Sequence, residues 1–141
     1  MIIIERATED DLAAVLALDY QVTGNAIRQQ ILADAIQVRQ CVVARRGGTP
    51  LGYLLVDRSF FGQYFIAAIL VHPDQRRQGV ATALVRHVEK TCPESRVFAS
   101  AGGFDSVMDA LYTKLGFVHS GHIDNLHESV PEIIYVKRLS R

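Results

Sequence analysis

One uninterrupted apolar run, followed at once by a turn and a helical pattern, limits the fold of this chain more than any other feature. Residues 64–71 are all apolar or aromatic, which is typical of a strand covered on both faces. His72-Pro73 ends this run, and from Val80 apolar residues recur at helical spacing until Pro93. The middle of the sequence therefore predicts a central strand, a polar turn and a helix.

Further strands and helices are expected on both sides of this segment. Gly47-Gly48 suits the turn of a hairpin, and Gly116 is a typical helix stop. No internal repeat, low-complexity segment or linker interrupts the pattern, so we expect a single α+β domain over residues 1–141 with a mostly antiparallel sheet. The other expected strands are 2–6, 41–44, 51–56, 97–100, 117–123 and 132–139, and the other expected helices begin near residues 12, 27 and 107.

Composition narrows the class of protein and its expected location. The 141 residues are 49% hydrophobic, enough for a packed core, and 15 basic residues balance 15 acidic ones. This balance gives no general attraction to nucleic acid or to an anionic membrane. Cys41 and Cys92 lie far apart and are expected as reduced thiols. The apolar stretch 1–4 is too short for a signal peptide and no run could span a membrane, so we expect a cytoplasmic location.

The junction between the central strand and the helix has the properties of an anion site. The first turn of a helix presents unpaired backbone N–H groups and the positive end of the dipole. Gly79 and Ala81 leave room for a phosphate to approach the backbone, and Arg76 and Arg77 add positive charge. A solvated basic turn that caps the helix is the competing interpretation, and the local pattern alone does not separate the two.

Two motifs resemble those of a known family, and this resemblance favours an anion site over a solvated basic turn. Residues 76–81, Arg-Arg-Gln-Gly-Val-Ala, resemble the (Arg/Gln)-x-x-Gly-x-(Gly/Ala) acetyl-CoA signature of the GNAT acetyltransferase superfamily. The preceding Val71-His72-Pro73-Asp74 is similar to the end of that family's fourth strand. Residues 110–117, Ala-Leu-Tyr-Thr-Lys-Leu-Gly-Phe, resemble its second hallmark. The expected order of elements also matches the family fold along nearly the whole chain.

The resemblance implies a sheet of about seven strands splayed between strands four and five, flanked by about four helices. It implies acetyl-CoA as co-substrate, with the pantetheine arm pairing along the strand at Leu70 and Val71. The pyrophosphate would rest on backbone N–H groups, and one amide of the strand could polarise the thioester carbonyl. The residues implied at the phosphates are Arg76, Arg77, Gln78, Gly79, Val80, Ala81 and Thr82.

Tyr112 is the residue that the resemblance assigns to catalysis, because the family's tyrosine at this motif position lies near the CoA sulfur. Its role would be that of a general acid. A phenol with a pKa of about 10 can protonate a departing thiolate whose conjugate acid has a pKa of about 8.5. Packing beside Met108 and Leu115 is the structural alternative for a tyrosine on this helix.

A general base is not assigned. Many GNAT enzymes use a glutamate of the fourth strand, but residues 63–72 contain no carboxylate. His72 is the nearest titratable group, although a His-Pro pair at a strand end favours a structural turn. A water relay or an acid from a loop, such as Glu128, are the other possibilities.

The remaining polar residues are interpreted structurally. Asp105 stands where many family members carry an asparagine that contacts CoA, but it suits the N-cap of the helix that follows. On a strand, His119 and His122 would point to opposite faces, so no metal site is expected. The family's acceptor pocket corresponds to the variable segments 20–25, 57–63 with Phe60 and Phe61, and 124–130.

The sequence therefore predicts an N-acetyltransferase that moves an acetyl group from acetyl-CoA to a primary amine of a small molecule or peptide. The amine would attack the thioester directly in a ternary complex. An acyl-CoA-binding module of the same fold without efficient catalysis is the alternative, supported by the missing carboxylate. The expected partners are acetyl-CoA and the amine, without nucleic acid, membrane or metal, in a monomer or homodimer.

Overall fold

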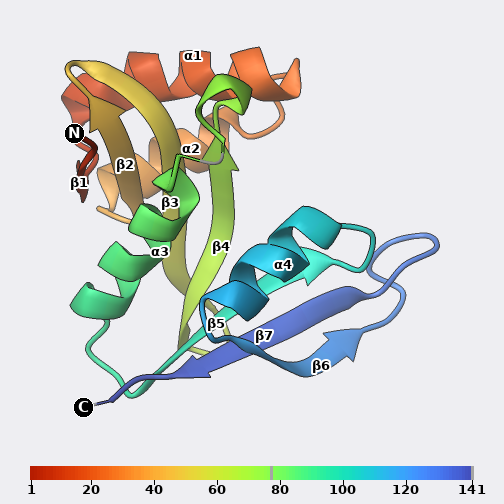
Figure 1. Ribbon diagram of the computed structural model, residues 1–141. Coiled ribbons are helices and arrows are strands. Elements are labelled where there is room, and N and C mark those ends of the chain that lie inside the picture. Colours follow the sequence, from red (N-terminus) through yellow and green to blue (C-terminus); the bar gives the residue numbers. More distant parts are fainter. Residues whose placement is uncertain (77, 141) are drawn as a thin grey trace. The chain divides into compact units, whose positions relative to one another are not determined.

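A computed structural model describes residues 1–76 and 78–140, and Figure 1 shows its elements. The expected helices and strands are present, and most boundaries agree with the expectation to within about two residues. The strands are β1 (Ile3–Arg6), β2 (Cys41–Arg46), β3 (Thr49–Phe60), β4 (Gln63–Val71), β5 (Arg96–Gly102), β6 (Val118–Ile123) and β7 (Glu132–Arg138). The helices are α1 (Leu12–Thr23), α2 (Gln29–Gln37), α3 (Val80–Thr91) and α4 (Ser106–Lys114), with short 3₁₀ turns η1 (Glu9–Asp11) and η2 (Pro73–Gln75).

The seven strands form one mixed sheet in the order β1-β2-β3-β4-β5-β7-β6. Antiparallel pairing joins β1 to β2, β2 to β3, β5 to β7 and β6 to β7, whereas β4 and β5 pair in parallel. The β4–β5 ladder consists of the pairs Phe65–Phe98 and Ile66–Ala99, so β4 continues beyond the ladder to Val71. The α+β class and the mostly antiparallel sheet are confirmed. None of the helices in the described ranges is long and apolar enough to cross a membrane.

The chain divides into two compact units, one formed by Met1–Val56 with Ala68–Lys90 and the other by Asp57–Ala67 with Thr91–Arg141. In the first unit, α1 and α2 pack on one face of β2 and β3 around a core that includes Val15, Leu32 and Tyr53. α3 lies on the opposite face (Figure 1), and its residues Val80, Leu84, Val85 and Val88 are buried. The single domain over residues 1–141 stays a prediction.

The strand covered on both faces is β3 rather than β4, which corrects the expectation for residues 64–71. All six residues from Leu51 to Val56 are buried, because α1 and α2 contact one face of this strand and α3 lies over the other. In β4 only Ile66 and Leu70 are buried, and Ala67 is exposed. The apolar composition therefore predicted the strand correctly. It did not predict which residues of the strand are covered by other elements.

Close contact between β3 and β4 depends on Gly52. A Cβ atom at this position would lie 2.7 Å from the carbonyl oxygen of Leu70 and 3.3 Å from Cα of Val71. Real side chains essentially never approach a backbone oxygen so closely, so one of the two strands would have to move. The glycine thus positions the end of β4.

We expect Gly52→Ala to destabilise the fold by about 1–3 kcal/mol, because the added methyl group overpacks the β3–β4 contact. Thermal unfolding of the variant measures this loss. Gly48→Ala is the matched control, since a Cβ atom there has no heavy atom within 4 Å and its φ is not positive. Equal midpoints for the two variants would contradict the proposed contact.

In the second unit, α4 lies across β5 and β7 (Figure 1). The side chain of Phe60 stacks on Phe65 with ring centroids 5.3 Å apart and lies 5.5 Å from the ring of Phe98. β3 continues to Phe60, four residues beyond the end of the strand expected over residues 51–56. The two turn residues are Phe61 and Gly62, both with positive φ, and the ring of Phe61 is 86% exposed.

Candidate active site

The junction between β4 and α3 is held by contacts of His72. Its backbone N–H donates to the carbonyl oxygen of Leu51 at 2.8 Å, and its Nδ1 accepts from the backbone N–H of Asp74 at 3.1 Å. His72 is thus the N-cap of η2, with Pro73 at the first position of that turn. This arrangement is the structural role expected for a His-Pro pair at a strand end.

The first turn of α3 begins next to Gly79 and presents backbone N–H groups that have no acceptor within the helix. The carbonyl oxygen of Gly79 accepts from the N–H of Ala83 at 2.9 Å, so the N–H groups of Val80, Ala81 and Thr82 have no acceptor within the helix. Gly79 has a φ of +79°, and no heavy atom lies within 4 Å of where its Cβ would be. The open space beside Gly79 and the backbone N–H groups at the positive end of this 12-residue helix suit an anion.

Most of the predicted cofactor residues form this one segment. Arg76, Gln78 and Gly79 are exposed, Ala81 and Thr82 are half-buried, and Val80 is buried. Leu70 is buried in the core and Val71 is half-buried. The prediction for Arg77 lies outside the described residues. Any binding role of the other side chains stays a prediction.

Arg46, at the end of β2, contacts this segment. The sequence did not indicate this contact. Its Nη1 donates to Oε1 of Gln75 and its Nη2 donates to Oε1 of Gln78, both at 3.2 Å. In the sequence Arg46 belongs to a basic hairpin turn, and no local pattern relates it to residues about 30 positions later.

Tyr112 lies in the second unit, on α4, with 1% of its surface exposed. Its ring packs against Tyr135 and Phe117, with centroids 4.9 and 5.2 Å apart. Burial, and secondarily the neighbouring Tyr135, raises the pKa of the Tyr112 phenol. The hydroxyl therefore stays protonated throughout the neutral range, as a hydrogen-bond donor must. The ring partners in the structure are Tyr135 and Phe117, and packing against Met108 and Leu115 stays a prediction.

A hydrogen-bonded network lies beside Tyr112. The hydroxyl of Tyr135 donates to Oδ1 of Asp109 at 2.7 Å, and Nε2 of His119 lies 2.9 Å from the same oxygen. These two contacts lower the pKa of the Asp109 carboxyl. Asp105 caps α4 as expected, because its side chain accepts from the N–H of Met108 at 3.0 Å.

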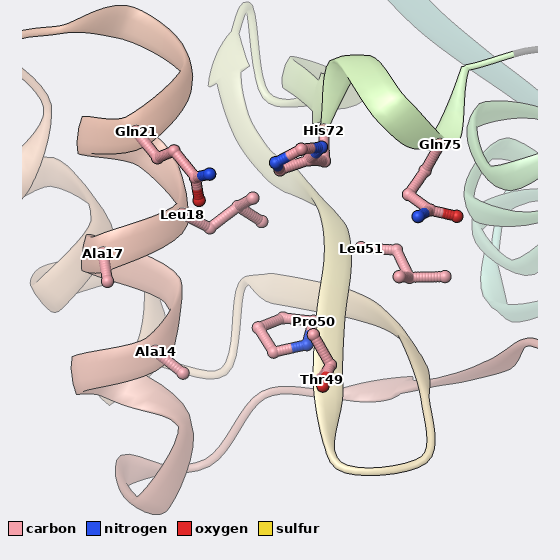
Figure 2. Close-up of a pocket in the computed structure, with 9 residues that line it drawn as sticks. All are labelled: Ala14, Ala17, Leu18, Gln21, Thr49, Pro50, Leu51, His72 and Gln75. Atoms are coloured by element: carbon pink, nitrogen blue, oxygen red, sulfur yellow. The ribbon is translucent and has the colours of Figure 1, made fainter.

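A cavity of about 330 Å³ lies in the first unit. Figure 2 shows its lining from α1, the start of β3 and the β4–α3 junction. Of the predicted cofactor residues that the structure describes, none lines the cavity, and His72 and Gln75 connect it to the junction. In the described ranges, no group of three His, Cys, Asp or Glu residues could hold a metal ion.

Comparison with known proteins identifies the family. The model of the acetyltransferase (GNAT) family matches residues 9–117, which is most of the chain. A crystal structure of a GNAT-family acetyltransferase from Bacillus cereus is 30% identical, covers 100% of this chain and 99% of its own, and superposes with a TM-score of 0.94. The chain belongs to the acetyltransferase (GNAT) family, and the expected fold and family resemblance are confirmed.

More distant relatives share the fold. The ribosomal-protein-S18-alanine N-acetyltransferase of Escherichia coli is 20% identical, with coverage of 100% and 96% and a TM-score of 0.83. The structure of yncA from Salmonella typhimurium, solved with its cofactor acetyl-CoA, is 16% identical, with coverage of 99% and 95% and a TM-score of 0.77. By sequence, the mouse cysteine-rich protein 2-binding protein is 27% identical over an alignment of 104 residues, and the match covers 67% of this chain and 13% of that protein.

Proposed function

We propose that this protein transfers the acetyl group of acetyl-CoA to a primary amine of a small molecule or peptide. The observation that carries the proposal is the open space beside Gly79 at the first turn of α3, where the first backbone N–H groups have no acceptor within the helix, in a chain of the GNAT family. CoA carries a pyrophosphate, which is the kind of anion that a helix N-terminus binds. A cytoplasmic location, and a monomer or homodimer, remain parts of this proposal.

The proposed cofactor residues act mainly through their backbone. The N–H groups from Gln78 to Thr82 bind the pyrophosphate, while Arg76 and Arg77 contribute charge. Backbone groups of Leu70 and Val71 pair with the pantetheine arm, and Gly52 supports this end of β4 through its close contact with Leu70. A backbone amide of the strand polarises the thioester carbonyl as charge develops on its oxygen.

The proposed reaction is a direct attack by the neutral amine. Its nitrogen forms a bond to the carbonyl carbon, the carbon–sulfur bond breaks, and the thiolate leaves. Tyr112 donates its phenolic proton, or a hydrogen bond, to the departing sulfur. Because burial raises the pKa of this phenol above its usual value, we expect stabilisation of the thiolate to matter more than complete proton transfer.

Water removes the proton from the acceptor amine in this proposal, and His72 does not. Nδ1 of His72 already accepts from the N–H of Asp74, so the proton of the neutral ring lies on Nε2, which then cannot accept another. No carboxylate lies between Gln63 and His72. This absence also favours the second candidate function, an acyl-CoA-binding module without efficient catalysis.

We expect kcat/KM to rise with pH toward the pKa of the amine, because only its neutral form attacks. His72→Asn should keep this profile, since an asparagine can still cap η2 while the imidazole is removed. A limb with an apparent pKa near 6.5 in the natural protein that disappears in His72→Asn and His72→Ala would identify His72 as the base.

A screen of amines tests the proposed function against the second candidate. The protein is mixed with acetyl-CoA and either small-molecule amines or peptides, and release of free CoA is followed. An acceptor-dependent release supports the enzyme. Tight binding of CoA without release by any amine would instead favour the binding module.

A further inference from the structure

Arg46 is the cation that the fold brings to the proposed phosphate site from outside the family motif. The ladder between β2 and β3 shifts register between Ala44 and Arg45, and such irregularities redirect the side chains that follow. Arg45 pairs with Glu5 and Asp11, each at 2.9 Å. Arg46 instead extends to η2 and the loop before α3.

The partners of Arg46 are neutral amides, so its positive charge is retained at the site. Its two terminal nitrogens each contact a different glutamine, Gln75 in η2 and Gln78 in the loop. The ion pairs formed within residues 1–76 and 78–140 do not include Arg46. A planar guanidinium presents parallel donors that can join two acceptors, which a single ammonium group does less well.

This contact organises donors for a phosphate. A glutamine amide has one oxygen and an NH₂ group. Because the guanidinium engages the oxygen of Gln75 and of Gln78, this contact does not use their NH₂ groups, which can serve as donors. The contact also restrains Gln78, whose backbone N–H belongs to the proposed pyrophosphate site. A restrained site loses less conformational entropy when it binds.

We propose that Arg46 is a positioning residue for the phosphate groups of CoA, acting through Gln75 and Gln78. This inference rests on the proposed function, since it requires that CoA bind at the first turn of α3. The role is one of orientation: Arg46 fixes the loop before the cofactor arrives, and its charge is secondary.

Calorimetric titration with CoA tests this role in the whole chain. We expect Arg46→Ala to raise Kd about tenfold, because two contacts that orient the loop are lost. Arg6→Ala is the matched control: it removes the same charge at the other end of the β1–β2 pair, opposite Val42, and should leave Kd within about twofold of the natural value. Thermal unfolding verifies that both variants are folded.

Two further variants separate orientation from charge. Arg46→Lys should bind CoA almost as weakly as Arg46→Ala, and the double variant Arg46→Ala with Gln78→Ala should bind no more weakly than Arg46→Ala alone. Full recovery in Arg46→Lys, additive losses in the double variant, or an unchanged Kd in Arg46→Ala would overturn the inference. Each of these results would leave the proposed function standing, because acetyl transfer requires that the natural protein bind CoA but does not require Arg46.

Discussion

Tyr112→Phe is expected to lower kcat by about a hundredfold or more, while the Kd of CoA changes by less than about threefold. The variant removes only the phenolic oxygen and keeps the ring that packs against Tyr135 and Phe117. A loss in kcat without a matching loss in binding indicates an interaction that forms in the transition state. Steady-state kinetics with an accepted amine and a separate titration with CoA measure the two quantities.

Tyr135→Phe is the matched control for this experiment, because it removes a hydroxyl from the same aromatic cluster. That hydroxyl is bonded to Asp109, so its loss should lower stability by about 1 kcal/mol and leave kcat within a few-fold of the natural value. If Tyr112→Phe behaves like Tyr135→Phe in both measurements, then Tyr112 is a packing residue and the proposed general acid is wrong.

Gly79→Trp is expected to abolish measurable binding of acetyl-CoA. The open space beside Gly79 is where the phosphates are proposed to lie, and an indole side chain would occupy it. The backbone of Gly79 has a φ of +79°, so any other residue also introduces strain of about 1–2 kcal/mol. Calorimetry measures the loss of binding, and thermal unfolding measures the strain.

Gly24→Trp separates strain from steric exclusion. Gly24 ends α1 with a φ of +76°, and a Cβ atom there would also meet no heavy atom within 4 Å. The two variants should lose similar stability, but only Gly79→Trp should lose acetyl-CoA binding. Unchanged affinity in a folded Gly79→Trp would show that residues 76–82 are not the pyrophosphate site.

The order of strands and helices could be predicted because it depends on local periodicity. The run of β-forming residues in β2, the helical spacing in α3 and the cap at Asp105 are each encoded within a few residues. The coverage of β4 could not be predicted in this way. Whether Ala67 is exposed depends on which elements pack over the strand, and an apolar run carries no information about them.

The same distinction between local sequence patterns and contacts formed on folding applies to the candidate site. The segment from Arg76 to Thr82 and Tyr112 could be named as candidates because each belongs to a contiguous motif, and their roles stay predictions. Arg46 could not, since it reaches Gln75 and Gln78 only after the β2–β3 hairpin and the β4–α3 junction have both formed. The requirement for Gly52 was missed for the same reason, because it depends on the neighbouring strand at Leu70.

Mass spectrometry of a reaction with isotopically labelled acetyl-CoA tests the central claim most directly. The natural protein is incubated with the labelled cofactor and an amine found in the screen, and both products are quantified. The account predicts one labelled acetyl group on the amine nitrogen for each free CoA released, with both products strongly reduced in Tyr112→Phe. Release of CoA without an acetylated amine, or the same yield in a folded Gly79→Trp variant, would contradict it.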